Sequence, residues 1–519
     1  MKMTGRKFSY AFLLFLFLLS GCKKEQVTTS LPRSVPEAQG VSSQGIIDFL
    51  DAAAKSRHEF HSFMFLRHGK VIAEGWWNPY KPELKHTLYS TSKSFTATAV
   101  GFAVSEKRLS VNDKVISFFP EALPDTVSPF LSDMKVKDLL SMSAGQDPDP
   151  TFKTVVNDSN WVKTFLAVPV VHEPGTKFLY NTLATYMLSA IIQKVTGEKV
   201  IDFLKPRLFD PLAIEGMDWE VDPHGINCGG WGLRLKTEDM AKFGQLFLQK
   251  GKWNGKQVLP ASWIEEATTL KIYQAPDAPQ SKKDSSDWMQ GYCYQMWRCR
   301  HNCFRADGAY GQYIIVIPDQ DAVIAITAET GDMQDEINLI WEYLLPAINT
   351  AKLAENTALS SNLKQKLSSL ALPLPVAGNG SVAASQISGK TFALEPNDRH
   401  LETMSLQFDS MCHLSMMIDS VRYNFSLGSG QWITGETTLH GPNLLLLAKA
   451  HFVGLPPAKV AGSFSWKDEN TLELVLRYIE SPHTETITCK FDKNKILVTI
   501  HYSNEPGNIQ HELTGVVKD

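Results

Sequence analysis

The sequence is poor in cysteine and carries no surplus of either charge. It has 7 cysteines in 519 residues, and 51 Lys and Arg are matched by 55 Asp and Glu, for a formal net charge of −4. A chain without an overall positive field is not drawn to nucleic acid, so we expect no such partner. Apolar residues make up 43% and charged residues 20%, which is typical of a globular protein and excludes a mostly disordered chain.

Several widespread catalytic motifs are absent as well. The sequence lacks the Gly-x-Ser-x-Gly turn of α/β-hydrolases, the His-Glu-x-x-His zinc helix, and the glycine-rich loops that bind phosphates and dinucleotides. Cys299 and Cys303, with His301 between them, do not form the Cys-x-x-Cys pairs of a zinc site. We therefore expect neither a metal nor a cofactor.

The first 22 residues predict export rather than a folded element. Three basic residues precede an apolar run over residues 11–19 that is too short to span a bilayer, and small residues lead to Cys22. This segment resembles the lipobox of bacterial lipoproteins, which implies that Cys22 is lipidated; the alternative is a plain secretory signal. Acyl chains on Cys22 would anchor the protein in a membrane of the bacterial cell envelope, on its periplasmic or extracellular face.

The six other cysteines are open to two interpretations. In an oxidising compartment they could form disulfides, whose connectivity cannot be deduced from the sequence, or they could remain inert thiols. They are Cys228, Cys293, Cys299, Cys303, Cys412 and Cys489.

The chain divides into two parts of different character. Residues 23–35 are polar and predict a flexible tether, and residues 36–350 alternate helical patterns with short strands. Residues 351–384 predict a helix and a Pro/Gly-rich linker. Strand alternation dominates residues 385–519, which predict an all-β domain.

Three local elements can be placed closely. Residues 63–67 and 71–73 predict strands around a His68-Gly69 turn, and Thr182 to Val195 has the apolar spacing of a helix. Residues 487–491 and 496–500 predict a hairpin in the all-β part.

Ser90 and Lys93 form a Ser-x-x-Lys tetrad at the start of an apolar helical run. Residues at i and i+3 share one face of a helix, so the Lys93 amine can reach the Ser90 hydroxyl. Free N–H groups and the positive dipole end of the first turn favour negative charge developing there. The same spacing recurs at Ser20, Ser132 and Ser361, where a solvated helix face explains the match, so the surroundings of Ser90 must decide.

Further segments follow Ser90 in a recognisable order. Tyr180-Asn181-Thr182 opens a helix, residues 228–244 form a glycine-rich stretch and a helix, and residues 308–312 lead into two strands. In this order the chain resembles the serine β-lactamase and penicillin-binding-protein superfamily, in its class C β-lactamase-related branch of esterases and amide hydrolases.

The resemblance implies an α+β fold, in which an antiparallel sheet is flanked by helices beside a helical subdomain; here a smaller all-β domain follows. It also implies that Ser90 is the nucleophile and Tyr180 the second catalytic group. By the same pattern, the backbone N–H groups of Ser90 and Ala309 form the oxyanion hole.

The chemistry of these groups agrees with such roles. A serine hydroxyl is a poor nucleophile and needs an adjacent base. Lysine and tyrosine have reference pKa values of about 10.4 and about 10, so neither is a base unless a neighbour or burial lowers its pKa. Lys93 and Tyr180 could do this for each other, and which of them is the base stays open, because coupled groups titrate as a unit.

The substrate residues follow from the same resemblance, with two departures. They are Asn181, Asp307, Gly308 and Gln312. We expect glycine at 308 because an edge strand must approach the substrate closely. β-Lactamases and DD-peptidases carry a cation and a hydroxyl before this glycine, whereas this sequence has Ala306 and Asp307, and Thr182 replaces the family's asparagine.

The first departure bears on substrate recognition, because the cation helps hold a substrate carboxylate. Arg305 should point to the same face as Asp307 rather than replace the missing lysine. Aromatic residues near the expected cleft suit an apolar or sugar-bearing substrate, although core packing explains most of them: Trp288, Tyr292, Tyr294, Trp297 and Tyr310.

Three functions are therefore open. The leading one is a serine hydrolase that cleaves an ester, amide or peptide bond in a small-molecule or peptide substrate through an acyl-enzyme at Ser90. The alternative is a β-lactamase or D,D-carboxypeptidase. The second alternative is a non-catalytic protein that binds cell-wall fragments, and the intact Ser90, Lys93 and Tyr180 argue against it.

Overall fold

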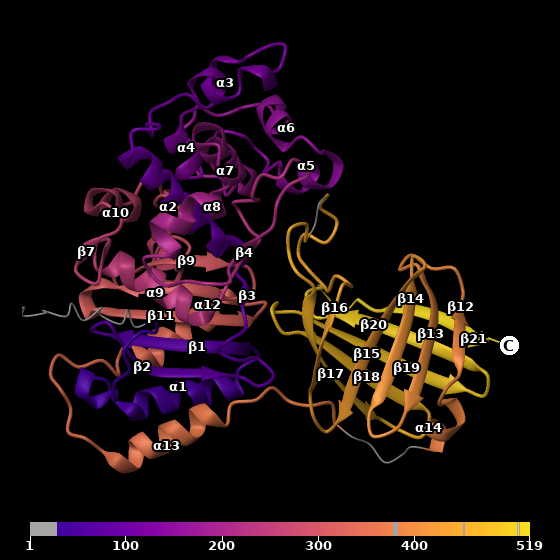
Figure 1. Ribbon diagram of the computed structural model, residues 1–519. Coiled ribbons are helices and arrows are strands. Elements are labelled where there is room, and N and C mark those ends of the chain that lie inside the picture. The colour runs from indigo at the N-terminus through magenta and orange to yellow at the C-terminus, as the bar shows by residue number, and fades with distance from the viewer. Residues whose placement is uncertain (1–28, 377–381, 450–451, 506, 508, 519) are drawn as a thin grey trace, which may run out of the picture.

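A six-stranded antiparallel sheet forms the centre of the first domain, in the order β2-β1-β11-β10-β9-β8 (Figure 1). The computed structural model describes residues 29–376, 382–449, 452–505, 507 and 509–518. The strands are β1 (Glu59–Arg67), β2 (Lys70–Trp76), β8 (Trp297–Arg298), β9 (Phe304–Gly308), β10 (Gln312–Ile317) and β11 (Ala322–Glu329). The predicted first hairpin is confirmed: β1 pairs with β2 across His68 and Gly69, whose φ angles of 50° and 70° suit the twist of the strands.

Helices cover both faces of this sheet, which is why β1, β10 and β11 are buried along almost their whole length. Side chains alternate along β1, so Phe63 and Phe65 enter one apolar core and Met64 and Leu66 the other. The first core is covered by α1 (Ser43–Lys55), α12 (Met333–Leu339), the π-helical η7 (Ile340–Leu344) and α13 (Thr357–Ser368). The second is covered by α2 (Ser92–Ser105) and α9 (Thr237–Leu248).

A helical subdomain extends from the second face of the sheet (Figure 1). Its helices are α3 (Pro129–Asp133), α4 (Val136–Leu140), α5 (Thr151–Asn157), α6 (Trp161–Ala167), α7 (Thr182–Thr196) and α8 (Val200–Leu204), which continues as the π-helical η5 (Lys205–Phe209). The helix predicted from Thr182 is confirmed as α7. It begins after Asn181, whose side chain accepts a hydrogen bond from the Ala184 N–H, and ends at Gly197, which has a φ of 77°.

Short elements complete the first domain. The helices are η1 (Glu37–Gln39), η2 (Tyr89–Thr91), η3 (Val115–Phe118), η4 (Pro120–Ala122), α10 (Ala261–Thr268), α11 (Gln280–Ser285) and η6 (Pro318–Gln320). The strands are β3 (His86–Thr87), β4 (Asp218–Trp219) and β5 (Leu233–Leu235) in one sheet, with β6 (Lys252–Trp253) and β7 (Lys256–Gln257) in another.

A ten-stranded sheet forms the second domain, in the order β15-β14-β13-β12-β21-β20-β19-β18-β17-β16, and an added β15–β17 pairing closes it on itself. Its elements are α14 (Val382–Ile387), β12 (Thr391–Leu394), β13 (Leu401–Phe408), β14 (Cys412–Ile418), β15 (Val421–Ser429), β16 (Ile433–Thr437), β17 (Ala458–Trp466), β18 (Thr471–Tyr478), β19 (Thr484–Asp492), β20 (Lys495–Tyr502) and β21 (His511–Val517). Inward-facing apolar residues alternate along the strands and form one core. The predicted β19–β20 hairpin and the α+β fold with an all-β second domain are thereby confirmed.

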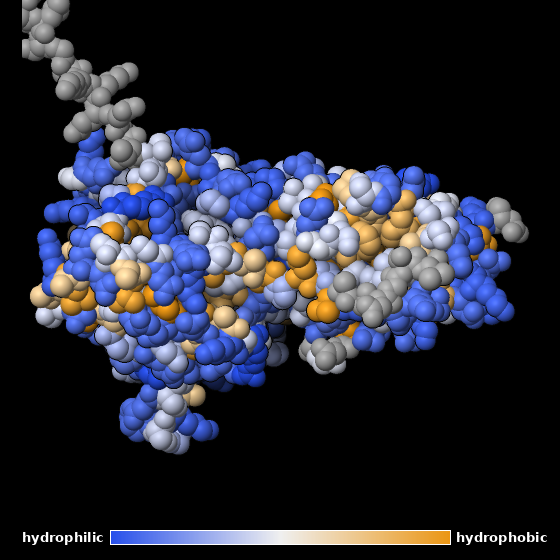
Figure 2. All heavy atoms as spheres, turned by 90° about the horizontal axis from the view of Figure 1, so that it is seen from below, coloured by the Kyte–Doolittle hydropathy of each residue, from blue (hydrophilic) through white to orange (hydrophobic). Residues whose placement is uncertain are grey.

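The two domains lie directly against each other, as the space-filling view also shows (Figure 2). The turn between β18 and β19 enters the first domain, where the Glu480 carbonyl accepts a 2.9 Å hydrogen bond from the Thr87 N–H. The Glu480 carboxylate pairs with Arg234 at 3.3 Å, and Arg477 pairs with Glu59. Apolar residues of the second domain also join the cores of the first: Leu445, Ala448, Ala461 and Ile479.

The last residues of the predicted tether, which spans residues 23–35, are folded. Leu31 is buried in the core beneath α9, and Arg33 pairs at 2.8 Å with both Glu74 and Glu238, so these residues are part of the folded domain. The predicted export segment, including Cys22, lies outside the described residues. Among the residues that the structure describes, no helix is long and apolar enough to cross a membrane.

The six described cysteines are buried free thiols. Burial raises the pKa of the Cys299 thiol to about 11. Of the two interpretations of the sequence, inert thiols therefore fit the structure and disulfides do not. No group of three or more potential metal ligands occurs in the part of the chain described.

Candidate functional site

Ser90 and Lys93 meet at the junction of sheet and helical subdomain. The sequence predicted that Ser90 opens the helix directly; instead Ser90 lies in the single 3₁₀ turn η2, and α2 begins two residues later. The Lys93 Nζ donates hydrogen bonds to Ser90 Oγ at 2.9 Å and to the Gly230 carbonyl at 2.8 Å. Lys93 is only 1% exposed, whereas Ser90 is partly open to solvent. The Ser90 hydroxyl can therefore be reached from solvent, whereas the Lys93 amine is buried.

The turn that holds Ser90 is strained. Tyr89 has a φ of 46°, in the left-handed region that a bulky side chain seldom adopts. A non-glycine residue in this region costs about 1–3 kcal/mol and persists only where the surroundings hold it. Tyr89 is 2% exposed and its hydroxyl contacts His483 of the second domain at 2.5 Å, which supplies such a restraint.

Burial gives Lys93 an unusual charge state. It lowers the pKa of Lys93 from 10.5 to about 7, against the opposing effect of the Asp149 and Asp307 carboxylates, which favour the ammonium. A large share of the amine is therefore uncharged at neutral pH. An uncharged amine whose nitrogen lies 2.9 Å from the Ser90 hydroxyl oxygen can take up the hydroxyl proton and so act as a general base.

Tyr180 lies beside the same amine. The Lys93 Nζ is 4.9 Å from the centre of its ring, which stacks on Trp297 at 5.6 Å between centroids and meets Tyr292 edge-on. Burial and the Asp307 carboxylate raise the pKa of Tyr180 far above its usual range, against a lowering effect of its hydrogen bond with Ser90. Tyr180 is therefore a neutral phenol that can donate a proton.

The structure gives a different reason for glycine at 308. A Cβ atom there would lie 2.1 Å from the Leu88 carbonyl oxygen, so the close neighbour is the backbone that enters the Ser90 turn and not a substrate. Thr91 Oγ1 donates a 2.9 Å hydrogen bond to the Gln312 carbonyl and ties the same two segments together. Ala309, which follows this glycine, is thus brought to the Ser90 turn, as an oxyanion hole formed by their two N–H groups requires.

Asp307 does not stand free in the site. Its carboxylate pairs with the Arg305 guanidinium at 2.8 Å, and Arg305 is fully buried with its guanidinium over the Trp288 ring at 4.3 Å. The prediction that Arg305 shares a face with Asp307 is confirmed. The guanidinium therefore neutralises this carboxylate and does not take the position of the family's lysine.

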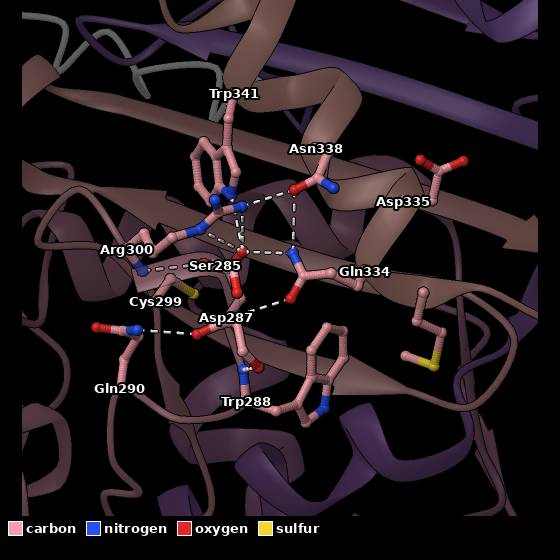
Figure 3. Close-up of polar contacts among 12 residues, drawn as sticks. Ser285, Asp287, Trp288, Gln290, Cys299, Arg300, Gln334, Asp335, Asn338 and Trp341 are labelled. Atoms are coloured by element: carbon pink, nitrogen blue, oxygen red, sulfur yellow. Dashed lines mark hydrogen bonds and ion pairs between the residues drawn. The ribbon is translucent and has the colours of Figure 1, made fainter. Parts of the chain in front are cut away.

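The buried Asp287 anchors the segment that carries Trp288 (Figure 3). The Asp287 carboxylate accepts hydrogen bonds from Arg300 at 2.9 Å, Gln334 at 2.8 Å and Trp341 at 3.0 Å, and its carbonyl accepts one from Arg305 at 2.9 Å. This cluster could not be predicted from the sequence, because its members lie far apart in the chain and form no motif. It holds the segment between α11 and β9, which includes β8, in place.

The side chains of two predicted substrate residues have partners within the protein. Asn181 is 1% exposed; its oxygen caps α7 and its amide donates to Gln146 Oε1 at 2.8 Å. Gln312 is fully buried, and its amide donates to the Ala309 and Ala328 carbonyls at 3.1 Å and 2.7 Å. A substrate would have to displace these contacts to bind either side chain.

The aromatic residues separate into three groups. Trp297 and Tyr292 pack around Tyr180, whereas Tyr294 packs against Trp263 in the core. Tyr310 turns toward the second domain, where its ring meets His483 at 4.7 Å. His483 and the Gly230 carbonyl could not be predicted from the sequence, since a lone histidine and a backbone oxygen leave no local signal.

Comparisons with known proteins agree with this architecture. The family model described as Beta-lactamase matches residues 54–345, which is more than half of the chain. The 6-aminohexanoate-dimer hydrolase of Paenarthrobacter ureafaciens is 26% identical over 281 residues, which cover 51% of this chain and 71% of that protein. A putative D-alanyl-D-alanine carboxypeptidase of Escherichia coli (strain K12) is 24% identical over 143 residues, covering 25% of this chain and 33% of that protein.

Solved structures share the fold of the first domain. A putative 6-aminohexanoate-dimer hydrolase from Bacillus anthracis superimposes with a TM-score of 0.51 at 22% identity, over 63% of this chain and 89% of that one. A putative beta-lactamase from Bacteroides dorei DSM 17855 gives a TM-score of 0.50 at 15% identity, over 59% of this chain and 99% of that one. By the match of the family model, this chain belongs to the Beta-lactamase family, whose members are serine hydrolases.

Proposed function

We propose that the protein cleaves an ester or amide bond through an acyl-enzyme formed on Ser90. The proposal rests on the 2.9 Å hydrogen bond between Ser90 Oγ and Lys93 Nζ. Burial lowers the pKa of Lys93 to about 7, so its amine can accept the hydroxyl proton at neutral pH.

Acylation and deacylation need no groups beyond these, the substrate and water. Ser90 Oγ attacks the carbonyl carbon while its proton moves to Lys93, and the N–H groups of Ser90 and Ala309 stabilise the oxyanion. The carbon–oxygen or carbon–nitrogen bond then breaks, and the leaving group takes a proton from the Lys93 ammonium, relayed by the Tyr180 phenol. Water attacks the acyl-enzyme by the same route, which releases a carboxylic acid and restores Ser90.

Substrates without a carboxylate beside the scissile bond fit this site best. Asp307 and Arg305 neutralise each other, and Arg305 is buried, so it offers no accessible cation to a substrate carboxylate. The similarity to a 6-aminohexanoate-dimer hydrolase supports amide cleavage as one activity. These observations favour an esterase or amidase over a β-lactamase or D,D-carboxypeptidase.

Replacement of the nucleophile tests the proposal. Ser90→Ala should abolish hydrolysis of p-nitrophenyl acetate and covalent labelling by a fluorophosphonate. Ser361→Ala is the matched control, because Ser361 belongs to another Ser-x-x-Lys tetrad but lies exposed on α13. Labelling that persists in Ser90→Ala would refute the assignment.

A substrate panel separates the remaining alternatives. The wild-type protein is incubated in parallel with p-nitrophenyl acetate, nitrocefin and a peptide ending in D-Ala-D-Ala. Turnover of the ester alone supports the proposal, and turnover of nitrocefin or the peptide supports the first alternative. The absence of both turnover and acylation would favour the second alternative, a non-catalytic binding protein.

We also propose that lipid on Cys22 anchors the protein to the bacterial cell envelope, on the basis of its sequence segment alone. In fractionated cells the wild-type protein should sediment with membranes, and Cys22→Ser should move it to the soluble fraction. Equal distribution of the two proteins would contradict the anchor.

A further inference from the structure

One histidine of the second domain lies against the catalytic turn. His483 is fully buried and follows β18 in the turn that enters the first domain. Its Nε2 lies 2.5 Å from the Tyr89 hydroxyl, and its Nδ1 lies 2.6 Å from Glu329 Oε1 at the end of β11. Since a carboxylate only accepts, Nδ1 donates to Glu329, and in the tautomer that has its only ring proton there Nε2 accepts from the Tyr89 hydroxyl.

The same imidazole contacts both sides of the proposed oxyanion hole. Tyr89 precedes Ser90, and Tyr310 follows Ala309. The Tyr310 ring meets His483 edge-on at 4.7 Å and lies 5.7 Å from the Tyr89 ring. Both tyrosines have left-handed backbones, with φ angles of 46° and 66°, so each N–H donor neighbours a residue whose conformation needs an external restraint.

Other contacts of this cluster also come from the second domain. The Leu444 N–H donates to the Tyr89 hydroxyl at 3.4 Å, and the Ser503 hydroxyl donates to Glu329 at 2.8 Å. Glu329 therefore orients the imidazole, and Ser503 orients Glu329. Each of these contacts would be lost without the second domain.

We propose that His483 is a positioning residue, through which the second domain holds Tyr89 and Tyr310 so that the Ser90 and Ala309 N–H groups converge on the tetrahedral oxygen. This inference rests on the proposed function, because it assigns the second domain a part in the same hydrolytic site.

Steady-state kinetics on the full chain test the inference. In His483→Ala we expect kcat for p-nitrophenyl acetate to fall by about 10- to 100-fold, since loss of one oxyanion-hole donor costs about 10²–10³ and a displaced donor costs less. KM should stay within about twofold, because the ground-state carbonyl depends little on this geometry. Tyr89→Phe, which removes only the hydroxyl, should give a smaller loss.

A tetrahedral analogue gives a readout that general destabilisation would not move. Phenylboronic acid forms an adduct on the serine and needs both N–H donors, so its affinity should fall in parallel with kcat in His483→Ala. In the double variant, Tyr89→Phe should add little, because His483 acts through that hydroxyl. His413→Ala is the matched control; this histidine is in the same domain, and its side chain is 39% exposed.

The outcomes separate this inference from the proposed function. If kcat and boronate affinity of His483→Ala stay within twofold of wild type, or if kcat falls while boronate affinity does not, the inference is overturned. Should His483→Ala fail to fold in a thermal melt, His483→Gln and Tyr89→Phe carry the same comparison. A wild-type protein that neither turns over ester nor labels at Ser90 refutes the proposed function itself.

Discussion

Two segments of the protein carry the same Ser-x-x-Lys spacing in opposite surroundings. At the start of α2, Lys93 is 1% exposed and bonds to Ser90 Oγ and the Gly230 carbonyl. On α13, Ser361 and Lys364 both lie exposed on the outer face of a helix that covers the sheet. Water solvates the second amine, whereas protein surrounds the first.

The two tetrads have the same spacing, and they differ in that protein encloses the Lys93 amine. A desolvated ammonium is costly, so burial lowers the pKa of Lys93 to about 7 even though two carboxylates oppose the shift. The Ser-x-x-Lys spacing brings the Lys93 amine close to the Ser90 hydroxyl, and the packing around the amine sets its pKa. Four experiments sharpen or break this contrast.

The largest effect is expected from removal of the amine. Lys93→Ala should lower kcat/KM for p-nitrophenyl acetate by about 10²–10⁴-fold, the range that a general base contributes. Lys364→Ala, its counterpart on α13, should leave kcat/KM unchanged. Equal effects of the two substitutions would mean that the enclosure of Lys93 has no role in catalysis.

A clash beside the Ser90 turn should have the next largest effect. Gly308→Ala places a Cβ 2.1 Å from the Leu88 carbonyl oxygen, so the strand must shift. We expect a loss of unfolding free energy of about 1–3 kcal/mol, as for overpacked sites, and about a tenfold fall in kcat. Gly331→Ala is the control, since a Cβ there meets no atom within 4 Å. Wild-type kinetics in Gly308→Ala would argue against an oxyanion hole at this junction.

The pH profile of the wild-type protein tests the charge state of Lys93. The uncharged amine is the active form and predominates above its pKa, so kcat/KM should rise with pH through about 7 and then level off. Measurement of kcat/KM for p-nitrophenyl acetate between pH 5 and pH 9 would reveal this rise, the acid limb of the profile. An activity that is flat across this window would contradict the lowered pKa.

The smallest expected effect is a shift, along the pH axis, of the acid limb of the kcat/KM profile. The Asp149 carboxylate favours the Lys93 ammonium, so Asp149→Asn should lower the pKa of Lys93 and move the acid limb to lower pH. Asp147→Asn is a close control, because this exposed carboxylate pairs with Lys177 instead. A limb that moves to higher pH in Asp149→Asn would reverse the assigned interaction.

Much of the fold could be predicted because its signals are local. Alternation identified the β1–β2 and β19–β20 hairpins, and apolar spacing identified α7. The site was predicted less completely. Asn181 and Gln312 were assigned to the substrate, but in the structure one caps a helix and the other bridges backbone carbonyls, and these uses depend on neighbours distant in the sequence.

The cluster around Asp287 and the position of His483 could not be predicted at all. Asp287 draws its partners from residues 300–341, and His483 lies 394 residues from Tyr89 in the chain. Contacts over such separations have no periodicity to detect. They arise only when strands and helices have packed, because the chain positions that meet are then set by the topology.

The sequence by itself indicated the order of the motifs, the break between the two domains and the residues for which we propose an acyl-enzyme, since these depend on residue type and spacing. Only the tertiary structure decided that Lys93 is enclosed, so that its pKa is lowered, and that the second domain contacts the turn beside Ser90. The physical reason is desolvation: the pKa of an amine and the restraint on a strained turn depend on what surrounds them, and the surroundings exist only after folding.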